Sequence, residues 1–128
     1  MWIGLVGSEM CIRDRGNSYG YNNLVVDTLN FQILKKLSKP VIFDVTHSLQ
    51  LPGGLGSSTG GRREYVLSLA KAGMSQSIAG LFLEAHPNPD EAKCDGPCAL
   101  PLSYLDEFLN QIKDLDDFVK GQNNLEIK

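Results

Sequence analysis

The chain has 128 residues, of which 42% are hydrophobic and 21% charged, and this is the size and composition of one folded domain. Its net charge of −3 and pI near 5.3 provide no basic field for nucleic acid, so we expect a small-molecule partner. No apolar run reaches the roughly 20 residues of a membrane span. The three cysteines are odd in number and lack zinc-ribbon spacing, which favours a reducing cytoplasm.

The first 14 residues, MWIGLVGSEMCIRD, differ in character from the rest of the chain. A signal peptide is a poor fit, since no basic region precedes the apolar run and no small-residue cleavage site follows it. The string resembles translated sequencing-adapter read-through. We therefore predict a non-native leader at 1–14, a folded unit at 15–121 and a frayed tail at 122–128.

Helices and strands are predicted to alternate along the folded unit. The expected helices span 22–36, 62–73 and 101–120, and the expected strands span 41–46 and 78–85. The expected helix caps are Asn22 or Asn23, then one of Ser57, Ser58 and Thr59, and finally Ser103. Both strands are short apolar runs without alternation, as in a parallel sheet that is covered on both faces. This order predicts an α/β fold.

Polar side chains follow each predicted strand. His47 stands at the end of the first strand, although a histidine that merely caps a strand is an alternative. Glu84 ends the second strand as the lone polar group of an apolar run, so we expect it to be buried with a partner. The carboxyl ends of parallel strands share one rim, which predicts that the two side chains meet. Asp95, in the next loop, completes a set that suits a divalent metal or a polyol.

A glycine-rich loop, SLQLPGGLGSSTGG, occupies residues 48–61 and is expected to be structureless. Long loops in compact domains are usually functional. Backbone amides there, together with Arg62 and Arg63, could converge on an anion. The alternative is a mobile linker with two solvated arginines, because the loop lacks the spacing of known phosphate-binding motifs. Cys94 and Cys98 are interpreted as packing residues rather than metal ligands.

Five motifs then point to one family. They are GYNNLVVD at 20–27, PVIFDVTHSLQ at 40–50, GGRR at 60–63, AGLFLEAHP at 79–87 and KCDGPCALPL at 93–102. In this order and with these gaps, they closely resemble the carboxyl-terminal part of the 3-deoxy-D-manno-octulosonate 8-phosphate synthase family. The related synthases of the 7-phosphate heptulosonate are similar in fold but differ in the last motif, so they are the alternative.

The resemblance implies a (β/α)8 TIM barrel, of which this chain is the last two βα units plus the helix after strand six. It implies the condensation of phosphoenolpyruvate with D-arabinose 5-phosphate, which releases phosphate, in an enzyme that is a homotetramer when complete. Because most of the strands that bind phosphoenolpyruvate are missing, we expect the fragment itself to be inactive. Open strand edges should also leave it marginally stable.

The resemblance also assigns residues. His47, Glu84 and Asp95 match the positions that coordinate the metal in metal-dependent members, and that contact substrates or the activated water in metal-independent ones. Arg15 coincides with an arginine that binds the phosphoenolpyruvate phosphate, and the loop from Gln50 through Arg62 and Arg63 would close over the pentose phosphate. A cysteine or an asparagine on the missing first strand decides metal dependence. The QLPGGLG loop resembles metal-dependent members, whereas the KCDGPCALPL segment resembles the metal-independent group over a longer run, so we favour the metal-independent group.

Overall fold

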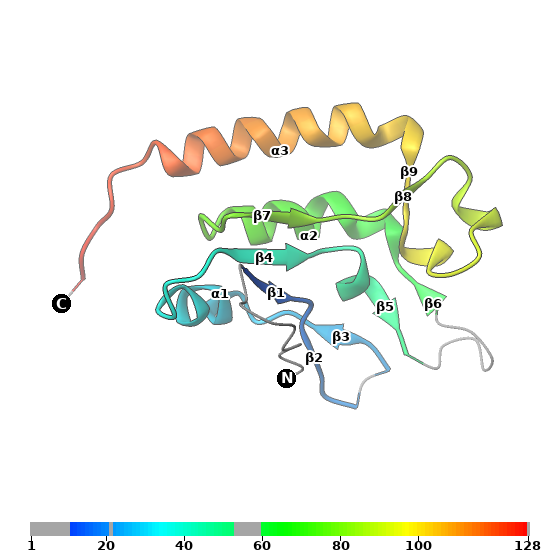
Figure 1. Ribbon diagram of the computed structural model, residues 1–128, viewed down its shortest axis with the longest axis horizontal. Coiled ribbons are helices and arrows are strands. Elements are labelled where there is room, and N and C mark those ends of the chain that lie inside the picture. Colours follow the sequence, from blue (N-terminus) through cyan, green and yellow to red (C-terminus); the bar gives the residue numbers. More distant parts are fainter. Residues whose placement is uncertain (1–10, 21, 53–59, 128) are drawn as a thin grey trace.

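The computed structural model describes residues 11–20, 22–52 and 60–127. In these ranges the central element is a parallel sheet of three strands in the order β1-β4-β7. The strands are β1 (Ile12–Asp14), β4 (Val41–Asp44) and β7 (Gly80–Phe82). Helix α1 (Thr28–Lys35) joins the first pair of strands and helix α2 (Val66–Met74) joins the second (Figure 1). Parallel strands joined by helices confirm the predicted α/β class, whereas closure into a TIM barrel stays a prediction.

The strand β1 was not expected. It pairs along its whole length with β4, in the register Ile12 with Val41 and Asp14 with Phe43. These residues were expected to belong to the leader, and only two parallel strands were predicted, so β1 is a correction to the predicted sheet. The proposal that residues 1–14 are non-native stays a prediction.

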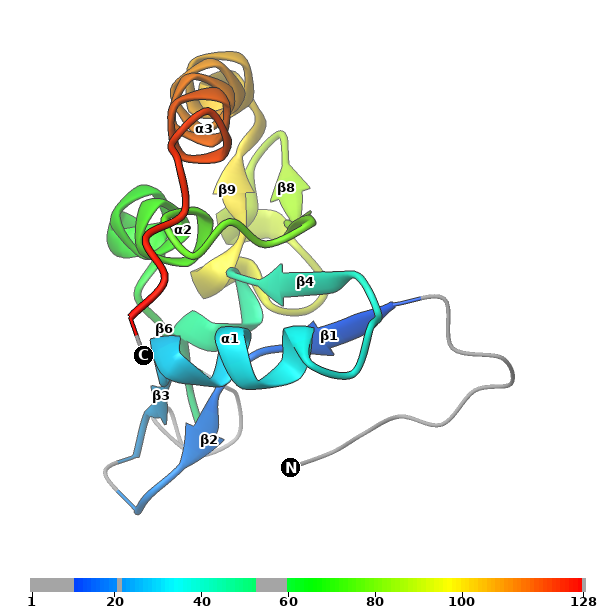
Figure 2. The ribbon, with the colours of Figure 1, turned by 90° about the vertical axis from the view of Figure 1, so that its left-hand side faces the viewer.

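A shared hydrophobic core joins the sheet to the helices. Phe31 from α1 and Phe43 from β4 are fully buried and meet edge to face, with ring centroids 5.1 Å apart. Helix α2 comes so close to β4 that a Cβ on Gly73 would lie 2.4 Å from a carbon of the Phe43 ring. Helix α3 (Leu105–Lys120) packs on α2 through Phe108 and Ile112, and Figure 2 shows α2 and α3 together on one side of the strands.

The first predicted helix is wrong over its first six residues. Residues Leu24–Val25 form β3, which pairs antiparallel with β2 (Asn17–Ser18), because the apolar pair, with the β-branched Val25, finds a strand partner there. The helix cap is Asp27, whose carboxylate accepts the Leu29 amide at 2.9 Å, and not Asn22 or Asn23. Asn22 has a φ of 56°, which no helix allows.

The glycine-rich loop is more ordered at its ends than predicted. Its described ends pair as an antiparallel ribbon, β5 (Gln50–Leu51) with β6 (Gly60–Gly61). The proposed caps Ser57, Ser58 and Thr59 lie outside the described residues. The next helix begins with a 3-10 turn, η2 (Arg63–Tyr65), and continues past Gly73 to Met74, so Gly73 is not its end.

After α2 the elements follow in the predicted order, but each is divided into shorter pieces. The second predicted strand splits into β7 and β8 (Ala85–His86), and β8 pairs in parallel with β9 (Leu100–Pro101). The predicted loop that holds Asp95 contains two 3-10 turns, η3 (Pro89–Glu91) and η4 (Gly96–Cys98). Before α3 stands η5 (Leu102–Tyr104), and Ser103 lies inside that turn rather than capping the helix.

Candidate active site

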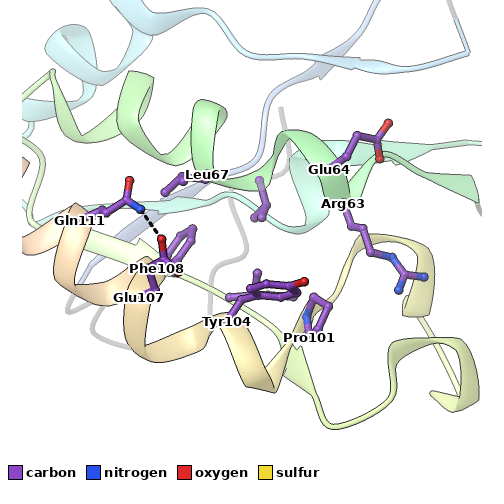
Figure 3. A pocket seen from close by; sticks show the side chains of 10 residues that line it. Arg63, Glu64, Leu67, Pro101, Tyr104, Glu107, Phe108 and Gln111 are labelled. Atoms are coloured by element: carbon purple, nitrogen blue, oxygen red, sulfur yellow. Dashed lines mark hydrogen bonds between the residues drawn. The ribbon is translucent and has the colours of Figure 1, made fainter.

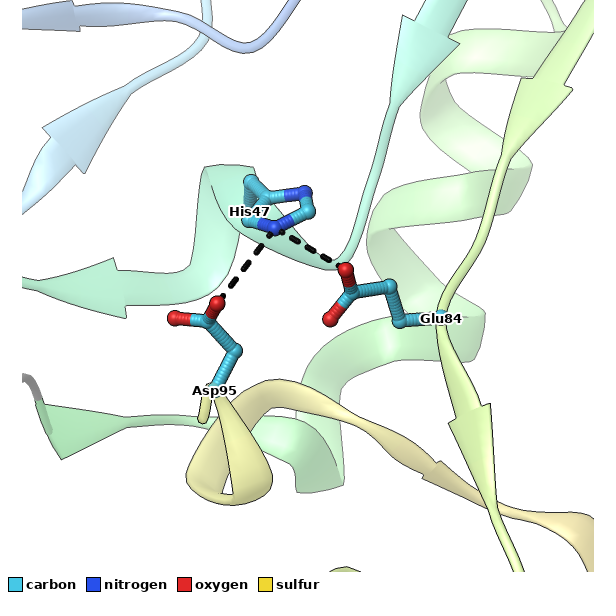
Figure 4. Close-up of side chains that lie close together, drawn as sticks. All are labelled: His47, Glu84 and Asp95. Atoms are coloured by element: carbon cyan, nitrogen blue, oxygen red, sulfur yellow. Dashed lines mark ion pairs between the residues drawn. The ribbon is translucent and has the colours of Figure 1, made fainter. Parts of the chain in front are cut away.

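Three predicted residues meet where the parallel strands end. His47, Glu84 and Asp95 each offer a ligand atom, and these atoms all lie within 4.8 Å of one another (Figure 4). Nε2 of His47 is 3.4 Å from a Glu84 oxygen and 3.8 Å from an Asp95 oxygen. The His47 side chain is only 12% exposed, which keeps bulk water from most of the ring. The arrangement is therefore a converging set of one imidazole and two carboxylates.

His47 begins a 3-10 turn, η1 (His47–Leu49), directly after β4. The turn is held to the strand because the Ser48 hydroxyl donates to the Asp44 carbonyl oxygen at 2.7 Å. Asp44 itself faces the imidazole, with its Oδ1 2.8 Å from Nδ1. The ring of Phe82 on β7 lies on another side, with its centroid 5.8 Å from that of the imidazole. The imidazole is thus held by contacts from two strands.

Glu84 lies between β7 and β8, where the main chain is clamped on both sides. Its amide donates to the Thr46 hydroxyl at 3.2 Å, and its carbonyl oxygen accepts from the Leu100 amide at 2.9 Å. The predicted burial of Glu84 is wrong, since its side chain is 36% exposed. Because the strand breaks before it, the carboxylate points into the open rim, and it contacts His47 as expected.

Asp95 is set by backbone conformation and by Gln50. It has a left-handed φ of 52° at the start of η4, which turns the chain back toward the sheet. Nε2 of Gln50 donates to Oδ1 of Asp95 at 2.6 Å, leaving the second oxygen toward His47. Gln50 begins β5, so the predicted substrate loop is tied at its first residue to the predicted acidic residue.

Cys98 lies close to the two acidic residues of the cluster, Glu84 and Asp95. Its side chain is buried, and burial raises the pKa of the thiol to about 11, with the negative charges of Asp95 and Glu84 adding to the rise. The thiol donates weakly to the Gly60 carbonyl oxygen at 3.9 Å. Such a thiol is a packing group at neutral pH. The expectation that Cys94 and Cys98 coordinate no metal stays a prediction.

The three predicted arginines lie apart from this cluster. Arg63 pairs with Asp90 and borders a cavity of about 380 Å³ between α2 and α3, which Figure 3 shows with Tyr104 at its edge. Arg62 lines a separate hollow near Leu49, and its buried Nε has no hydrogen-bond partner among the described residues. Arg15 is exposed. None of the three forms an ion pair with the cluster in the part of the chain that the structure describes.

Sequence reasoning missed two charged residues next to the site. Asp44 is fully buried behind His47, and Arg13 lies 3.5 Å from its carboxylate. A carboxylate inside the apolar run VIFDV was the available signal for Asp44. Arg13 was overlooked because it falls in the excluded leader.

A histidine and carboxylates in this geometry can bind a divalent cation, accept protons from hydroxyl groups or orient water. Placed where helix-connected parallel strands end, they define an α/β protein of the kind that carries its chemistry on one rim of the sheet. Within the described ranges, no helix combines the length and apolar character needed to cross a bilayer.

A sequence model of the DAHP synthetase I family matches residues 4–121, so the chain belongs to that family. Curated relatives named 2-dehydro-3-deoxyphosphooctonate aldolase are closely similar. The relative from Hahella chejuensis is 63% identical over 118 residues, which are 92% of this chain and 42% of that protein. Those from Pseudomonas fluorescens SBW25 and Pseudomonas entomophila are 64% and 65% identical over 113 residues, 88% of this chain. The resemblance predicted from the motifs is confirmed.

The chain spans about two fifths of the length of these curated relatives. The described residues therefore represent only part of the structure that the relatives possess.

Proposed function

We propose that the protein to which this chain belongs condenses phosphoenolpyruvate with D-arabinose 5-phosphate to give 3-deoxy-D-manno-octulosonate 8-phosphate and phosphate. The observation that carries the proposal is the identity of 63% over 118 residues with a relative named for that aldolase. The convergence of His47, Glu84 and Asp95 supports it. In this proposal the enzyme is a cytoplasmic homotetramer.

The reaction needs two kinds of help, and the cluster could give the one that concerns water. The enol carbon attacks the aldehyde carbon, so the aldehyde must be polarised, and water must then reach an oxocarbenium-like centre. His47, Glu84 and Asp95 would take a proton from the attacking water and pass a proton to the aldehyde oxygen as it becomes a hydroxyl. Loss of the phosphate from the resulting adduct completes the reaction.

Phosphate binding would fall to the arginines and the loop. Arg62, whose buried Nε lacks a described partner, and Arg63 would hold the pentose phosphate together with Gln50. Arg15 would contact the phosphoenolpyruvate phosphate. Arg63 would first have to leave Asp90, an exchange that costs little because Asp90 is 79% exposed.

A divalent metal fits the donor set, because imidazole and carboxylate oxygens are ordinary ligands of borderline cations. When bound there, it would act as a Lewis acid on a substrate oxygen. A closed shell needs a fourth ligand, and the resemblance places that position upstream of this chain. We propose that this protein belongs to the metal-independent group. A cysteine at the upstream position, with activity lost on chelation, would contradict this assignment.

A chimera tests the proposed reaction. Residues 15–121 would replace the matching segment of the Hahella chejuensis relative, and phosphate release would be measured with phosphoenolpyruvate and D-arabinose 5-phosphate. We expect turnover by the chimera and none by the 128-residue chain alone. Turnover by the chain alone would contradict the claim that this fragment is inactive.

Two comparisons sharpen the result. Glu84→Gln should lower kcat by about 100-fold or more, whereas Asp117→Asn, on the exposed face of α3, should leave it unchanged. Preference for a four-carbon aldose phosphate would instead support the related 7-phosphate heptulosonate synthase. Sugar-phosphate binding without turnover in the chimera would indicate an anion-binding module.

A further inference from the structure

Asp44 is a buried acidic residue whose role is not explained by the proposed reaction. Its side chain is 0% exposed, at the end of β4. Both of its carboxylate oxygens lie within hydrogen-bond distance of Nδ1 of His47, at 2.8 and 3.0 Å. A buried carboxylate requires donors, and here the imidazole is the nearest one.

The other neighbours of Asp44 are also donors. The His47 amide donates to Oδ1 at 3.3 Å, and Nε of Arg13 lies 3.5 Å from Oδ2. The Arg13 guanidinium is held above the Phe82 ring, 4.4 Å from its centroid. If Asp44 carried a proton, that proton would point at a group that itself donates a hydrogen. Asp44 therefore acts as a carboxylate and accepts from Nδ1–H of His47.

This arrangement fixes which nitrogen of His47 faces the cluster. With its proton on Nδ1, the neutral imidazole presents the bare Nε2 toward Glu84 and Asp95. Three acceptors then point into one space, which is complementary to a cation, a water proton or a substrate hydroxyl. The contact with Phe82 and the turn η1 further restrict the ring.

We propose that Asp44 is a positioning residue that fixes the tautomer and the orientation of His47, so that Nε2 is an acceptor at the active site. Acceptors of this kind behind a histidine are known to set its tautomer and basicity. The inference deepens the proposed function, since it concerns the same site. Its test reads the tautomer without turnover, so it can fail while the proposed reaction stands, and the reverse also holds.

The chain provides an internal reference. It has two histidines, His47 and His86. Nδ1 of His86 accepts from the Asn88 amide at 3.1 Å, so that neutral ring must carry its proton on Nε2. The two histidines are therefore expected to have opposite tautomers in one sample.

The experiment is a long-range ¹H–¹⁵N correlation spectrum of the 128-residue chain with ¹⁵N-labelled imidazole rings, recorded at about pH 9, well above the ordinary histidine pKa of about 6.5. The variants are Asp44→Asn and, as a charge-matched control on exposed α3, Asp117→Asn. We expect Nδ1–H for His47 and Nε2–H for His86. Asp44→Asn should shift the His47 ratio toward Nε2–H at least about tenfold, because a carboxamide can donate to Nδ1. Asp117→Asn should not change it.

A proton on Nε2 of His47 in the unmodified chain would overturn the proposal, whether or not any variant folds. The same tautomer for both histidines in a folded sample would also overturn it; if circular dichroism shows the 128-residue chain to be unfolded, the same two histidines are read in the chimera. If Asp44→Asn keeps its circular dichroism spectrum and its His47 tautomer, Asp44 serves packing alone and the proposal is wrong.

Discussion

Replacing Gly61 with alanine should displace the turn that carries Asp95 and so lower the activity of the proposed site. A Cβ at this position would lie 2.4 Å from Sγ of Cys98 and 2.5 Å from the Pro97 carbonyl oxygen. Ordinary contacts need about 3.5 Å, so η4 must retreat by roughly 1 Å. Asp95 begins that turn, and its 2.6 Å bond to Gln50 would break.

The expected loss is large because a 1 Å displacement of a reacting group can cost about 100-fold in rate, or about 2.7 kcal/mol. The assay is kcat/KM of the chimera with both substrates. Gly80→Ala is the matched control, since its Cβ would meet only a methyl group of Ile42 at 3.5 Å. Adding Cys98→Ala to Gly61→Ala should recover only part of the loss, because the Pro97 carbonyl remains in the way. Activity of Gly61→Ala within threefold of the unmodified chimera would refute this reasoning.

Four further predictions concern stability and reactivity. Gly73→Ala would place a Cβ 2.4 Å from a carbon of the Phe43 ring, so overpacking of about 1–3 kcal/mol should outweigh a helix-propensity gain of about 1 kcal/mol; an unchanged urea midpoint would contradict it. Asp27→Ala removes the cap of α1 and should cost about 1 kcal/mol, or about 4 °C in Tm, whereas equal loss in Asp27→Asn would argue against a capping role. Cys98 should resist iodoacetamide at pH 8 while the exposed Cys94 reacts, because the Cys98 pKa is raised to about 11; equal labelling by mass spectrometry would oppose this. Folding raises the pKa of Cys98, so the thiol's contribution to stability is present below pH 9.0 and is lost as the pH rises toward 11. Cys98→Ala should therefore flatten the pH dependence of the free energy of unfolding between pH 9.0 and about 11.

The order of the main elements follows from local residue patterns. Val41, Ile42 and Phe43 predict a buried strand because β-branched and aromatic residues fit a pleated sheet covered on both sides, and β4 is that strand. The terminal helix is clear from apolar spacing alone, and α3 begins within four residues of the predicted start. The placement of His47 and Glu84 on one rim followed from strand direction, which needs no side-chain coordinates.

Features that depend on pairing partners distant in the chain arise only in the folded structure. Leu24 and Val25 could continue a helix locally, but pairing with β2 makes them a strand. Ile12–Asp14 became a strand only through its register with β4. In both cases the competing local conformations differ by little in free energy, so a long-range partner settles the choice.

The same reason governs the site. Asp95 reaches His47 because a left-handed residue turns η4 back and Gln50, 45 positions earlier, holds the carboxylate. Asp44 and His47 are only three residues apart in the sequence, yet the role of their contact depends on the burial of Asp44 between β1 and β7. Residue types could be read along the chain, but distances and burial arise only when the strands pair, because these are properties of groups that the chain brings together from separate segments.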